Sequence, residues 1–420
     1  MDSVLMPNEI ELYVETMVPQ DLRNLGSEQW LDWHYRLQKL NQEAAVEASQ
    51  LKEEHVKEAM VSFGKAKILV HEAICINIWK FKVLPRLLKL EPQPESTFIA
   101  YSILYHEGVS VSLLELVMFH ANCCEALEDS SLDLLDYACG TVSQLLSVKP
   151  TDPKFHKENP EEELMRQRSN LSFEIGIRCL TILRYLTENI ASLPISVSSG
   201  LYTTYDVPVL LTEILLVRPW IKNKKVYVTS KWKDWDGEQL PQSDAQVWLT
   251  LRYILLDPEC SKYYPITESR RNQLVKLLNM LTPTLLDQLS PLLELKHWLC
   301  RMSCLQKYAS PPKPILLEAI LDIKEAIMRQ CQGKWRKIAE KQAPVIFNSN
   351  KASLQEAARK LTEAYNTELL EHFESKGTQQ LCAKCDNNAI QRCSQCKNTW
   401  YCSRSCQVAD WSSHKLNCNS

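Results

Sequence analysis

The residues best suited to chemistry in this sequence are the cysteines of its C-terminal tail. Of the 16 cysteines among 420 residues, seven fall between positions 382 and 418, where the pattern reads C-x2-C-x7-C-x2-C-x5-C-x3-C-x7-H-x3-C. Zinc takes four tetrahedral nitrogen or sulfur ligands, and a two-residue spacer lets one turn present two thiolates to the same ion. Eight ligands make two closed sites with no position left for water, so the spacing predicts two structural zinc ions. The eight candidate ligands are Cys382, Cys385, Cys393, Cys396, Cys402, Cys406, His414 and Cys418.

The residues alone leave two pairings of these ligands open. Sequential pairing and interleaved pairing each give one site of four cysteines and one site of three cysteines with a histidine. A segment this short cannot bury enough apolar area to fold by itself, so metal binding of ~10–16 kcal/mol per structural site would supply the missing free energy. The alternative is a cysteine-rich tail that binds no metal.

The tail does not have the charge of a nucleic-acid-binding module. Residues 382–418 include five Lys or Arg and two Asp or Glu, and two zinc ions with seven thiolates would bring the net charge to zero. The whole chain carries a net charge of -3. Because neutralisation of phosphates dominates nucleic-acid affinity, we expect no nucleic-acid partner and favour peptide recognition by the tail.

The elements that precede the tail are predicted to be helices. Only 9 glycines occur in the chain, and tight turns, hairpins and phosphate-binding loops need the positive φ that glycine allows. Apolar residues also recur at helical spacing. We therefore expect a mainly α, multi-helix scaffold domain over residues 1–376, for which an armadillo- or HEAT-like array is one possibility although no clear repeat is found. A small zinc finger would follow at 381–418. One predicted buried stripe is Ile175, Cys179, Ile182, Leu183 and Leu186.

Several helix starts can be predicted from their capping residues. Ser27 stands ahead of an amphipathic helix, and Asn159 followed by Pro160 supplies an N-cap with proline at the first helical position. Ser243 and Gln246 have the spacing of a capping box.

The segment 218–235 is the least helical part of the first domain. It has six Lys or Arg against one Asp, with four aromatic residues between them, and VYVT alternates like a short strand. We predict a solvated hairpin or a partner-docking insertion. A patch that binds single-stranded nucleic acid is the less favoured alternative.

The sequence offers no recognisable catalytic constellation. No two glycines are close enough to form a nucleotide-binding loop or a nucleophile elbow, and none of the nine histidines begins an H-x-D motif. His71-Glu72 and His106-Glu107 lack the second histidine that a zincin requires. We therefore expect that the chain is not an enzyme.

Two further histidine–cysteine pairs have helical spacing. His71 with Cys75, and His120 with Cys124, could together form another metal site. Buried cysteines and partly buried histidines are ordinary in helical cores, so packing is the favoured interpretation.

The chain is expected to lie in the cytosol or the nucleus. Its N-terminus is acidic and lacks the basic region of a secretory signal, and charged or polar residues interrupt its apolar stretches before they reach the length of a membrane span. The cysteines would then be free thiols or metal ligands rather than disulfides.

The tail resembles the MYND-type zinc finger, on the elements YC-SRSCQ and W-x2-H-x3-C. In that family the ligand pairs interleave, which implies one zinc on Cys382, Cys385, Cys402 and Cys406 and the other on Cys393, Cys396, His414 and Cys418. MYND fingers are typically docking modules for short proline-containing segments. The resemblance implies that two residues, Gln407 and Trp411, line the peptide groove, whereas the alternative for Trp411 is packing over the zinc core.

Nearly the whole chain resembles MYND-containing cytoplasmic assembly factors for axonemal dynein arms. The segments SEQWLDWHYRLQKLNQEA, SLDLLDYACG, FEIGIRCLTILRYLTENI, TPTLLDQLSPLLELKHWL and GKWRKIAEKQ carry this resemblance. It implies a non-enzymatic, co-chaperone-like scaffold whose partners are a leucine-rich-repeat assembly factor, heat-shock chaperone machinery and dynein chains as clients. The implied location is the cytoplasm, including centrosomes or centriolar satellites and the apical cytoplasm of ciliated cells.

A nuclear transcriptional adaptor or corepressor is the alternative function, because other MYND proteins recruit corepressors through the same groove. Such an adaptor would be expected to carry a basic nuclear import cluster. The sequence has no run of five Lys or Arg, which favours the assembly scaffold.

Overall fold

Helices make up most of the computed structural model, which confirms the predicted mainly α class with a metal-ligand cluster at the C-terminus. The chain divides into two compact units, residues 1–358 and 359–420, each of which is described by itself. The predicted boundary between 376 and 381 lies outside the described residues. The structure describes residues 5–50, 53–148, 150, 159–228, 230–258, 260–304, 320–348, 382–385, 389, 391–393, 399–415 and 418.

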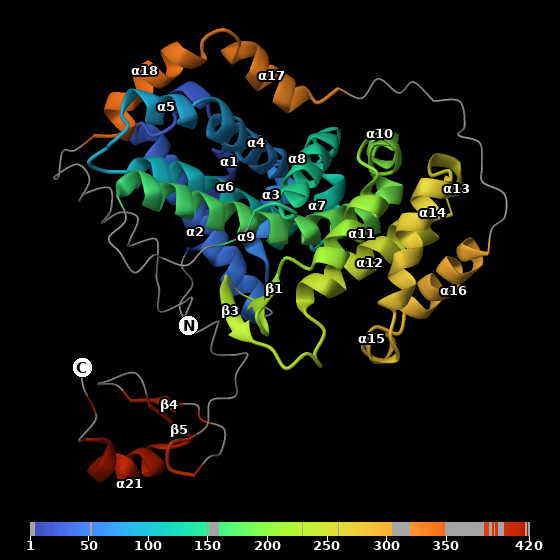
Figure 1. Cartoon of the computed structure of the whole chain (residues 1–420). Helices are drawn as coiled ribbons and strands as arrows, with labels where there is room; N and C mark the ends of the chain where they lie inside the picture. Colours follow the sequence, from blue (N-terminus) through green and yellow to red (C-terminus); the bar gives the residue numbers. More distant parts are fainter. Residues whose placement is uncertain are drawn as a thin grey trace. The chain divides into compact units, whose positions relative to one another are not determined.

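The first half of the helical unit contains the longest helices of the described chain (Figure 1). Its α-helices are α1 (Pro7–Glu15), α2 (Glu28–Gln50), α3 (His55–Ser62), α4 (Ala66–Lys82), α5 (Leu84–Leu90), α6 (Phe98–Val117), α7 (Ala121–Glu125), α8 (Ser130–Gln144) and α9 (Pro160–Glu188). The longest of them are α9, α2, α6 and α4.

The second half has shorter helices and a small sheet. Its α-helices are α10 (Ile195–Ser199), α11 (Val207–Val217), α12 (Gln242–Leu256), α13 (Cys260–Tyr263), α14 (Glu268–Leu274), α15 (Pro283–Gln288), α16 (Leu292–Ser303), α17 (Asp322–Cys331) and α18 (Trp335–Ile346). Short 3-10 or π turns are η1 (Leu22–Asn24), η2 (Ile190–Ser192), η3 (Gly200–Thr204) and η4 (Val275–Asn279).

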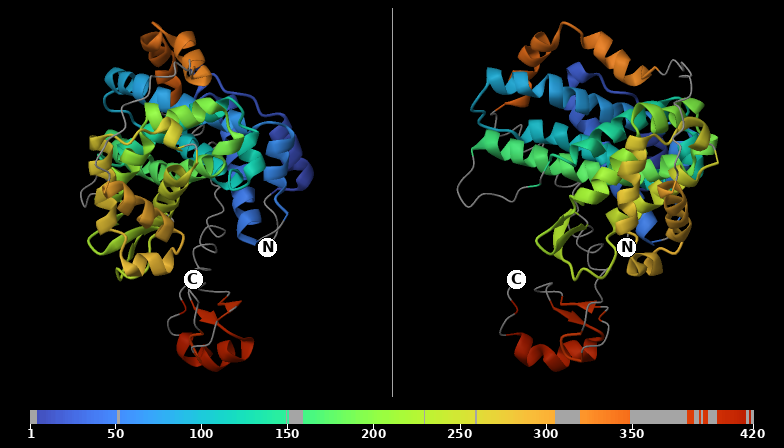
Figure 2. Two further views of the ribbon diagram at one scale, coloured as in Figure 1. Left: turned by 90° about the vertical axis from the view of Figure 1, so that its right-hand side faces the viewer. Right: turned by 45° about the vertical axis from the view of Figure 1, so that its right-hand side comes forward.

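The 29-residue helix α9 is the centre of the packing, since α6, α8 and α12 all lie against it (Figures 1 and 2). It begins where predicted: Asn159 Oδ1 accepts a hydrogen bond from the Glu162 N–H at 2.8 Å, and Pro160 occupies the first helical position. Gly176 lets the end of α8 approach, because a Cβ there would lie 2.6 Å from Leu145 Cδ2.

The other two predicted caps have different outcomes. Ser27 Oγ accepts a hydrogen bond from the Trp30 N–H at 3.3 Å, so the cap of α2 is confirmed. The capping box at Ser243 is wrong, because α12 starts at Gln242. Its N-cap is Pro241, whose extended backbone (φ -60°, ψ 142°) begins the helix before Ser243 is reached.

The segment 218–235 forms a three-stranded antiparallel sheet rather than a single hairpin. Its strands β1 (Ile221–Lys222), β2 (Lys225–Val228) and β3 (Lys231–Asp234) lie in the order β1-β2-β3. The segment is not simply solvated either. Tyr227 and Trp232 pack on Phe173 of α9, with ring centroids 5.0 Å and 6.3 Å away.

The arrangement of helix pairs as an armadillo- or HEAT-like array stays a prediction.

No single helix in the described ranges has the length and apolar composition needed to cross a membrane, although the bent pair Ile195–Thr204 and Val207–Val217 satisfies both criteria together.

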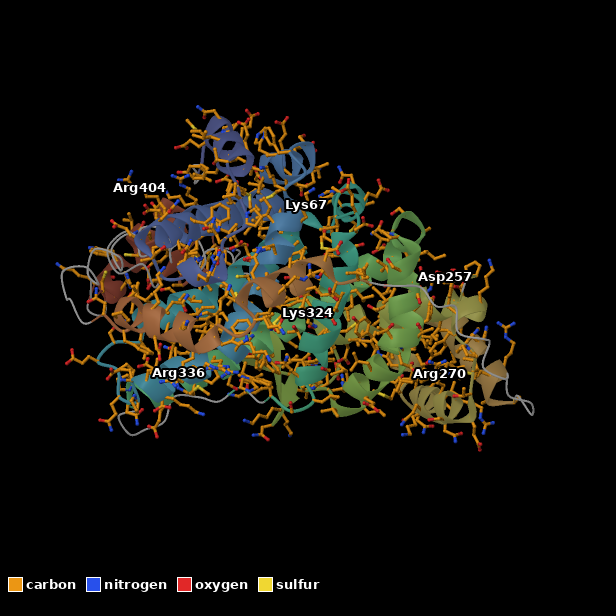
Figure 3. All side chains as sticks on the ribbon, turned by 90° about the horizontal axis from the view of Figure 1, so that it is seen from above. Lys67, Asp257, Arg270, Lys324, Arg336 and Arg404 are labelled. Carbon is orange, nitrogen blue, oxygen red and sulfur yellow. The ribbon has the colours of Figure 1, made fainter. Side chains whose placement is uncertain are left out.

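Helix α17, whose Lys324 is labelled in Figure 3, is tied to the rest of the helical unit by polar contacts with α8. Asp133 of α8 accepts hydrogen bonds from the first backbone N–H groups of α17, those of Ile323 at 3.4 Å and Lys324 at 3.2 Å. Lys324 Nζ also lies 2.6 Å from Asp136 Oδ2. A helix distant in sequence is therefore held to α8 by two carboxylates.

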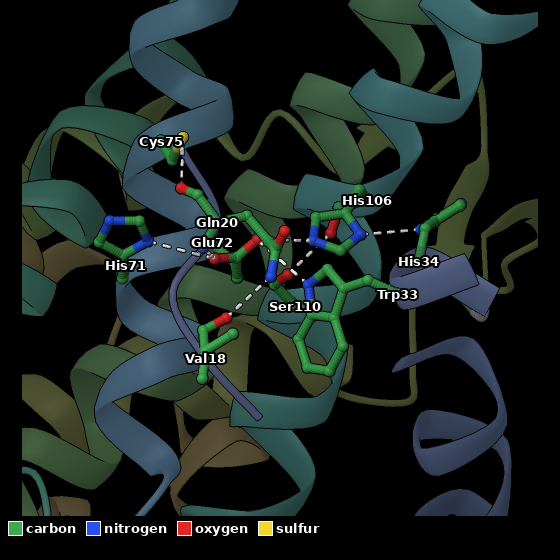
Figure 4. Close-up of polar contacts among 9 residues, drawn as sticks. All are labelled: Val18, Gln20, Trp33, His34, His71, Glu72, Cys75, His106 and Ser110. Carbon is green, nitrogen blue, oxygen red and sulfur yellow. Dashed lines mark hydrogen bonds and ion pairs between the residues drawn. The ribbon is translucent and has the colours of Figure 1, made fainter. Parts of the chain in front are cut away.

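The carboxylate of Glu72, on α4, is the centre of a buried polar network (Figure 4). Its Oε1 accepts hydrogen bonds from the backbone N–H of Gln20 at 2.8 Å and from His71 Nδ1 at 3.1 Å. Its Oε2 accepts from His106 Nε2 at 3.1 Å and Trp33 Nε1 at 3.4 Å. Burial alone would raise the pKa of Glu72, but the hydrogen bonds from His106 and His71 outweigh it and lower the pKa to about 2. The ionised carboxylate thus joins α2, α4 and α6.

His34 and His106 face each other in the same network (Figure 4). Their Nδ1 atoms are 2.8 Å apart, so only one of the two carries the hydrogen. Gln38 Nε2 donates to His34 Nε2 at 3.1 Å, which places the hydrogen of His34 on Nδ1 and that of His106 on Nε2, facing Glu72. Both imidazoles are then neutral. Burial disfavours the charged imidazole and holds the pKa of His34 well below its ordinary value of 6.5.

We expect the helical unit to lose stability as the pH falls below 6.5, because an unfolded chain protonates His34 there and the folded one does not. Urea unfolding between pH 7.5 and 5 should show the free energy of unfolding falling by up to ~1.4 kcal/mol per pH unit. His34→Gln should flatten that slope, whereas His297→Gln, at an exposed histidine of α16, should leave it unchanged. An equal slope in both variants would contradict the assignment.

Candidate metal centre

The C-terminal tail folds as a two-stranded sheet followed by one helix. The strands β4 (Gln391–Arg392) and β5 (Trp400–Tyr401) are antiparallel, and α21 spans Arg404–His414. The Ser403 hydroxyl caps α21 by accepting a hydrogen bond from the Cys406 N–H at 3.3 Å. These elements place candidate ligands before β4, after β4, after β5 and on α21.

Four cysteines converge into a first ligand group. The Sγ atoms of Cys382, Cys385, Cys402 and Cys406 all lie within 4.8 Å of one another. The Cys385–Cys402, Cys402–Cys406 and Cys385–Cys406 distances are 3.4, 3.5 and 3.8 Å. Sulfurs ~2.3 Å from a central zinc would be ~3.8 Å apart in a tetrahedron. The group therefore fits a four-thiolate zinc site.

The ionisation of these thiols also suits a cation. Burial opposes ionisation of Cys382, but hydrogen bonds from the backbone N–H groups of Cys402, Lys384 and Cys385 lower the pKa of its thiol to about 6. Hydrogen bonds with Cys385 and Cys406 raise the pKa of Cys402 to about 12. A divalent ion among the sulfurs would remove this difference by stabilising every thiolate.

A second ligand group contains Cys393, His414 and Cys418, whose ligand atoms also lie within 4.8 Å of one another. The two sulfurs are 3.8 Å apart. His414 Nδ1 lies 3.3 Å from Thr399 Oγ1, and a hydrogen bond to one ring nitrogen is the usual way in which a ligand histidine is oriented. The fourth candidate, Cys396, lies outside the described residues.

The seven described ligands are therefore grouped in the interleaved order. Cys406 stands in the first turn of α21 and His414 at its end, ~12 Å apart at the ~1.5 Å rise of a helix. One zinc ion cannot reach both, which rules out the sequential alternative. If zinc binds, it would be held entirely by protein ligands and would stabilise the fold rather than activate water.

The buried aromatic residue of the tail is Tyr401, not Trp411. Tyr401 is 0% exposed, and its hydroxyl donates a hydrogen bond to Asp410 Oδ2 at 2.8 Å. Trp411 is 37% exposed, although its ring lies 5.9 Å from that of His414. Trp411 thus touches a ligand from the outside and keeps an open face.

Two apolar side chains are exposed on α21, next to the polar side chain of Gln407. Gln407 is half-buried, and Val408 is 68% exposed, three residues before Trp411. The sequence reasoning missed Val408. The sequence feature that could have indicated it is an isolated apolar residue in a mostly polar helix. Val408 and Trp411 have the i, i+3 spacing that places two side chains next to each other on a helix.

The two other histidine–cysteine pairs do not converge, so the hypothesis of a further metal site there is wrong. Among the described residues, the groups of three or more possible ligands that lie close enough together to hold a metal ion are both in the tail. Cys75 Sγ instead contacts the Gln20 carbonyl oxygen at 3.8 Å, and Cys124 Sγ contacts that of Met118 at 3.4 Å. Both cysteines are buried core residues, as the favoured interpretation expected.

Comparisons with known proteins support the finger and extend beyond it. The model of the MYND finger family matches residues 382–418. The zinc finger MYND domain-containing protein 10 homolog of Drosophila melanogaster is 35% identical over 451 residues, which cover 100% of this chain and 99% of that protein.

Two other relatives match only over the finger. Tudor domain-containing protein 1 of Mus musculus is 54% identical over 37 residues, 9% of this chain and 3% of that protein. Deformed epidermal autoregulatory factor 1 of Drosophila melanogaster is 46% identical over 37 residues, 9% of this chain and 6% of its own. No solved structure matches the chain.

We expect the purified chain to contain two zinc ions, measured by mass spectrometry of the metal. Cys393→Ala should lose about one ion, because three ligands hold structural zinc poorly, while the helical circular dichroism of the first unit stays unchanged. Cys300→Ala, at an exposed cysteine of α16, is the matched control and should keep both ions. A wild-type content of one ion would contradict the double site.

Proposed function

Because the chain belongs to the family of the zinc finger MYND domain-containing protein 10 homologs, we propose that it is a non-enzymatic, co-chaperone-like scaffold for the cytoplasmic preassembly of axonemal dynein arms. A MYND finger attached to a large helical unit supports a role in protein binding. The observation that carries the proposal is the match over the full length, because it includes the helical segments on which the resemblance to assembly factors rests.

The finger is the proposed docking module. Two zinc ions would fix its ligands, and the inner side of α21 contributes Cys406 and His414 to the two ligand groups. Metal binding would therefore leave the exposed side of the helix, with Trp411 on it and Gln407 at its edge, available to a partner. A proline-containing segment could place apolar area on Trp411 and hydrogen-bond its backbone to the Gln407 amide.

The proposed partners follow from the family resemblance. The finger would bind a leucine-rich-repeat assembly factor, and the scaffold would bring heat-shock chaperone machinery to axonemal dynein chains. The work would take place in the cytoplasm, including centriolar satellites and the apical cytoplasm of ciliated cells. Catalysis by the chain itself has no part in this proposal.

The nuclear adaptor is less well supported. Relatives such as Deformed epidermal autoregulatory factor 1 share only the finger, 9% of this chain, so they carry no information on the helical unit. The full-length relative matches both units.

We expect affinity purification of the tagged chain from ciliating cells to recover dynein chains and chaperones, and tagged protein to lie in the cytoplasm. Deleting residues 381–420 should remove the leucine-rich-repeat factor, because the proposed docking face is deleted, while proteins that bind the helical unit remain. A nuclear signal with recovered corepressors would overturn the scaffold in favour of the adaptor.

Docking and folding of the finger can be separated by Gln407→Ala combined with Trp411→Ala. We expect the double variant to keep its zinc, because neither residue is a ligand, and to bind the leucine-rich-repeat factor at least ~10-fold more weakly in calorimetry. An aromatic anchor typically contributes ~2–4 kcal/mol to binding, and tenfold corresponds to ~1.4 kcal/mol.

Ser412→Ala, at an exposed serine of the same helix, is the control and should bind like the wild type. Loss of zinc from the double variant would show that Trp411 belongs to the finger core. Unchanged affinity with intact zinc would place the partner on another surface.

A further inference from the structure

We propose that a cleft on the helical unit, remote from the finger in sequence, is a second docking site, which receives an arginine side chain of a partner protein. The cleft has a volume of about 540 Å³ and lies between α9, the end of α6, strand β2 and the start of α12. We call it the α9 cleft. Its volume is in the range of ligand-binding pockets, ~300–1,000 Å³.

One face of α9 forms the wall of the cleft. Glu174, Arg178, Thr181 and Tyr185 follow one another at spacings of four, three and four residues, which places them along one stripe of the helix. The stripe is distinct from the buried stripe of α9 that packs on the core. It is polar at one end and aromatic at the other.

The charges in the cleft are not balanced. Arg178 is its only cation among the lining residues, and it serves two carboxylates: Nη1 donates to Glu115 Oε2 at 2.7 Å and Nη2 to Glu174 Oε1 at 3.3 Å. Glu174 Oε1 also accepts from Ser230 Oγ at 2.8 Å. Among the described residues, no hydrogen bond reaches Glu115 Oε1 or Glu174 Oε2. A third lining carboxylate, Glu54, is paired with Lys57 outside the cleft. One negative charge and two oxygens of the other two carboxylates therefore remain for a cation.

Buried polar groups without partners line the same cleft, independently of these charges. Thr181 is 6% exposed and Ser243 is 7% exposed, yet neither hydroxyl makes a hydrogen bond within the described parts of the chain. Gln246 Oε1 is likewise buried and accepts no hydrogen bond. Buried polar groups are normally paired, so the unpaired Gln246 Oε1, together with the hydroxyls of Thr181 and Ser243, indicates a ligand rich in donors.

A guanidinium group fits these acceptors best. It offers five N–H donors in one plane and a permanent charge, whereas an ammonium offers three donors at one point. Its planar face also stacks on aromatic rings. Tyr185 and Tyr227 line the cleft, and the ring of Phe119 lies edge-on to that of Tyr185 at 6.2 Å.

The exposed rim indicates that the arginine belongs to a protein rather than to a small molecule. Phe119 is 66% exposed at the edge of the cleft. A free amino acid held at the floor would leave this ring in water, but residues flanking an arginine in a chain would cover it. Aromatic residues around a buried charged anchor are typical of protein interfaces.

The test measures binding of the full-length chain to two immobilised libraries of nonapeptides. The central residue is arginine in one library and citrulline in the other, and the flanking residues are varied in both. Citrulline has the size of arginine but no charge. We expect the best arginine peptides to bind at least ~10-fold more tightly than their citrulline counterparts, because citrulline cannot form charge-assisted hydrogen bonds; tenfold corresponds to ~1.4 kcal/mol. Equal binding of both series, or binding of neither, would overturn the proposal.

Two variants place the binding in the cleft. Phe119→Ala and Gln246→Leu should each weaken binding of the selected arginine peptide several-fold. The controls are Phe63→Ala, at an exposed phenylalanine, and Gln144→Leu, at a half-buried glutamine, both outside the cleft. They should leave the affinity unchanged. Circular dichroism checks that every variant is folded. Equal effects of test and control variants would overturn the site. If N-acetyl-arginine amide displaces the peptide at an equal concentration, the residues that flank the arginine contribute nothing to binding. That result would overturn the proposal that the partner is a protein.

Discussion

A buried carboxylate must be fully hydrogen-bonded, and this requirement at Glu72 fixes how the first helices meet. An isolated charge in a protein interior is very unfavourable, so the four groups that donate to Glu72 have to be present together. They come from the segment before α2 and from α2, α4 and α6. Glu107, the residue after His106 on α6, repeats the arrangement, because Lys80 and Asn77 of α4 and Tyr137 of α8 donate to it. The helices are held by direction-dependent bonds as well as by apolar contact.

Other carboxylates supply caps to helices that lack them locally. Glu47 of α2 accepts hydrogen bonds from the backbone N–H groups of His55 and Val56 at the start of α3, at 3.0 and 3.2 Å. Asp133 does the same for α17, across 190 residues of sequence. The first N–H groups of a helix need acceptors, and here a neighbouring helix provides them. The N-termini of α3 and α17 are therefore positioned by tertiary contacts.

The two units are stabilised in different ways, which bears on how each one could bind partners. The helical unit has an extensive apolar core, whereas the described core of the tail consists of Cys382, Cys393 and Tyr401 with a few partly buried neighbours. Metal ligation would replace the missing apolar burial. A helix held by ligands on its inner side can keep apolar residues such as Val408 exposed on its outer side. The helical unit, by contrast, offers a cleft between packed helices, the α9 cleft.

The sequence by itself determined what depends on near neighbours. The ligand spacing, the cap at Asn159 and the buried stripe of α9 follow from residues a few positions apart, because local geometry sets which side chains share a turn or a face. The cap predicted at Ser243 was wrong because Pro241 competes for the same role two residues earlier. Only the tertiary structure decided that the tail ligands interleave, since the length of α21 separates Cys406 from His414. It also decided which groups donate hydrogen bonds to Glu72, and that Thr181 and Ser243 line the same cleft. These groups lie tens of residues apart in sequence, and no local pattern records which distant acceptor meets which donor.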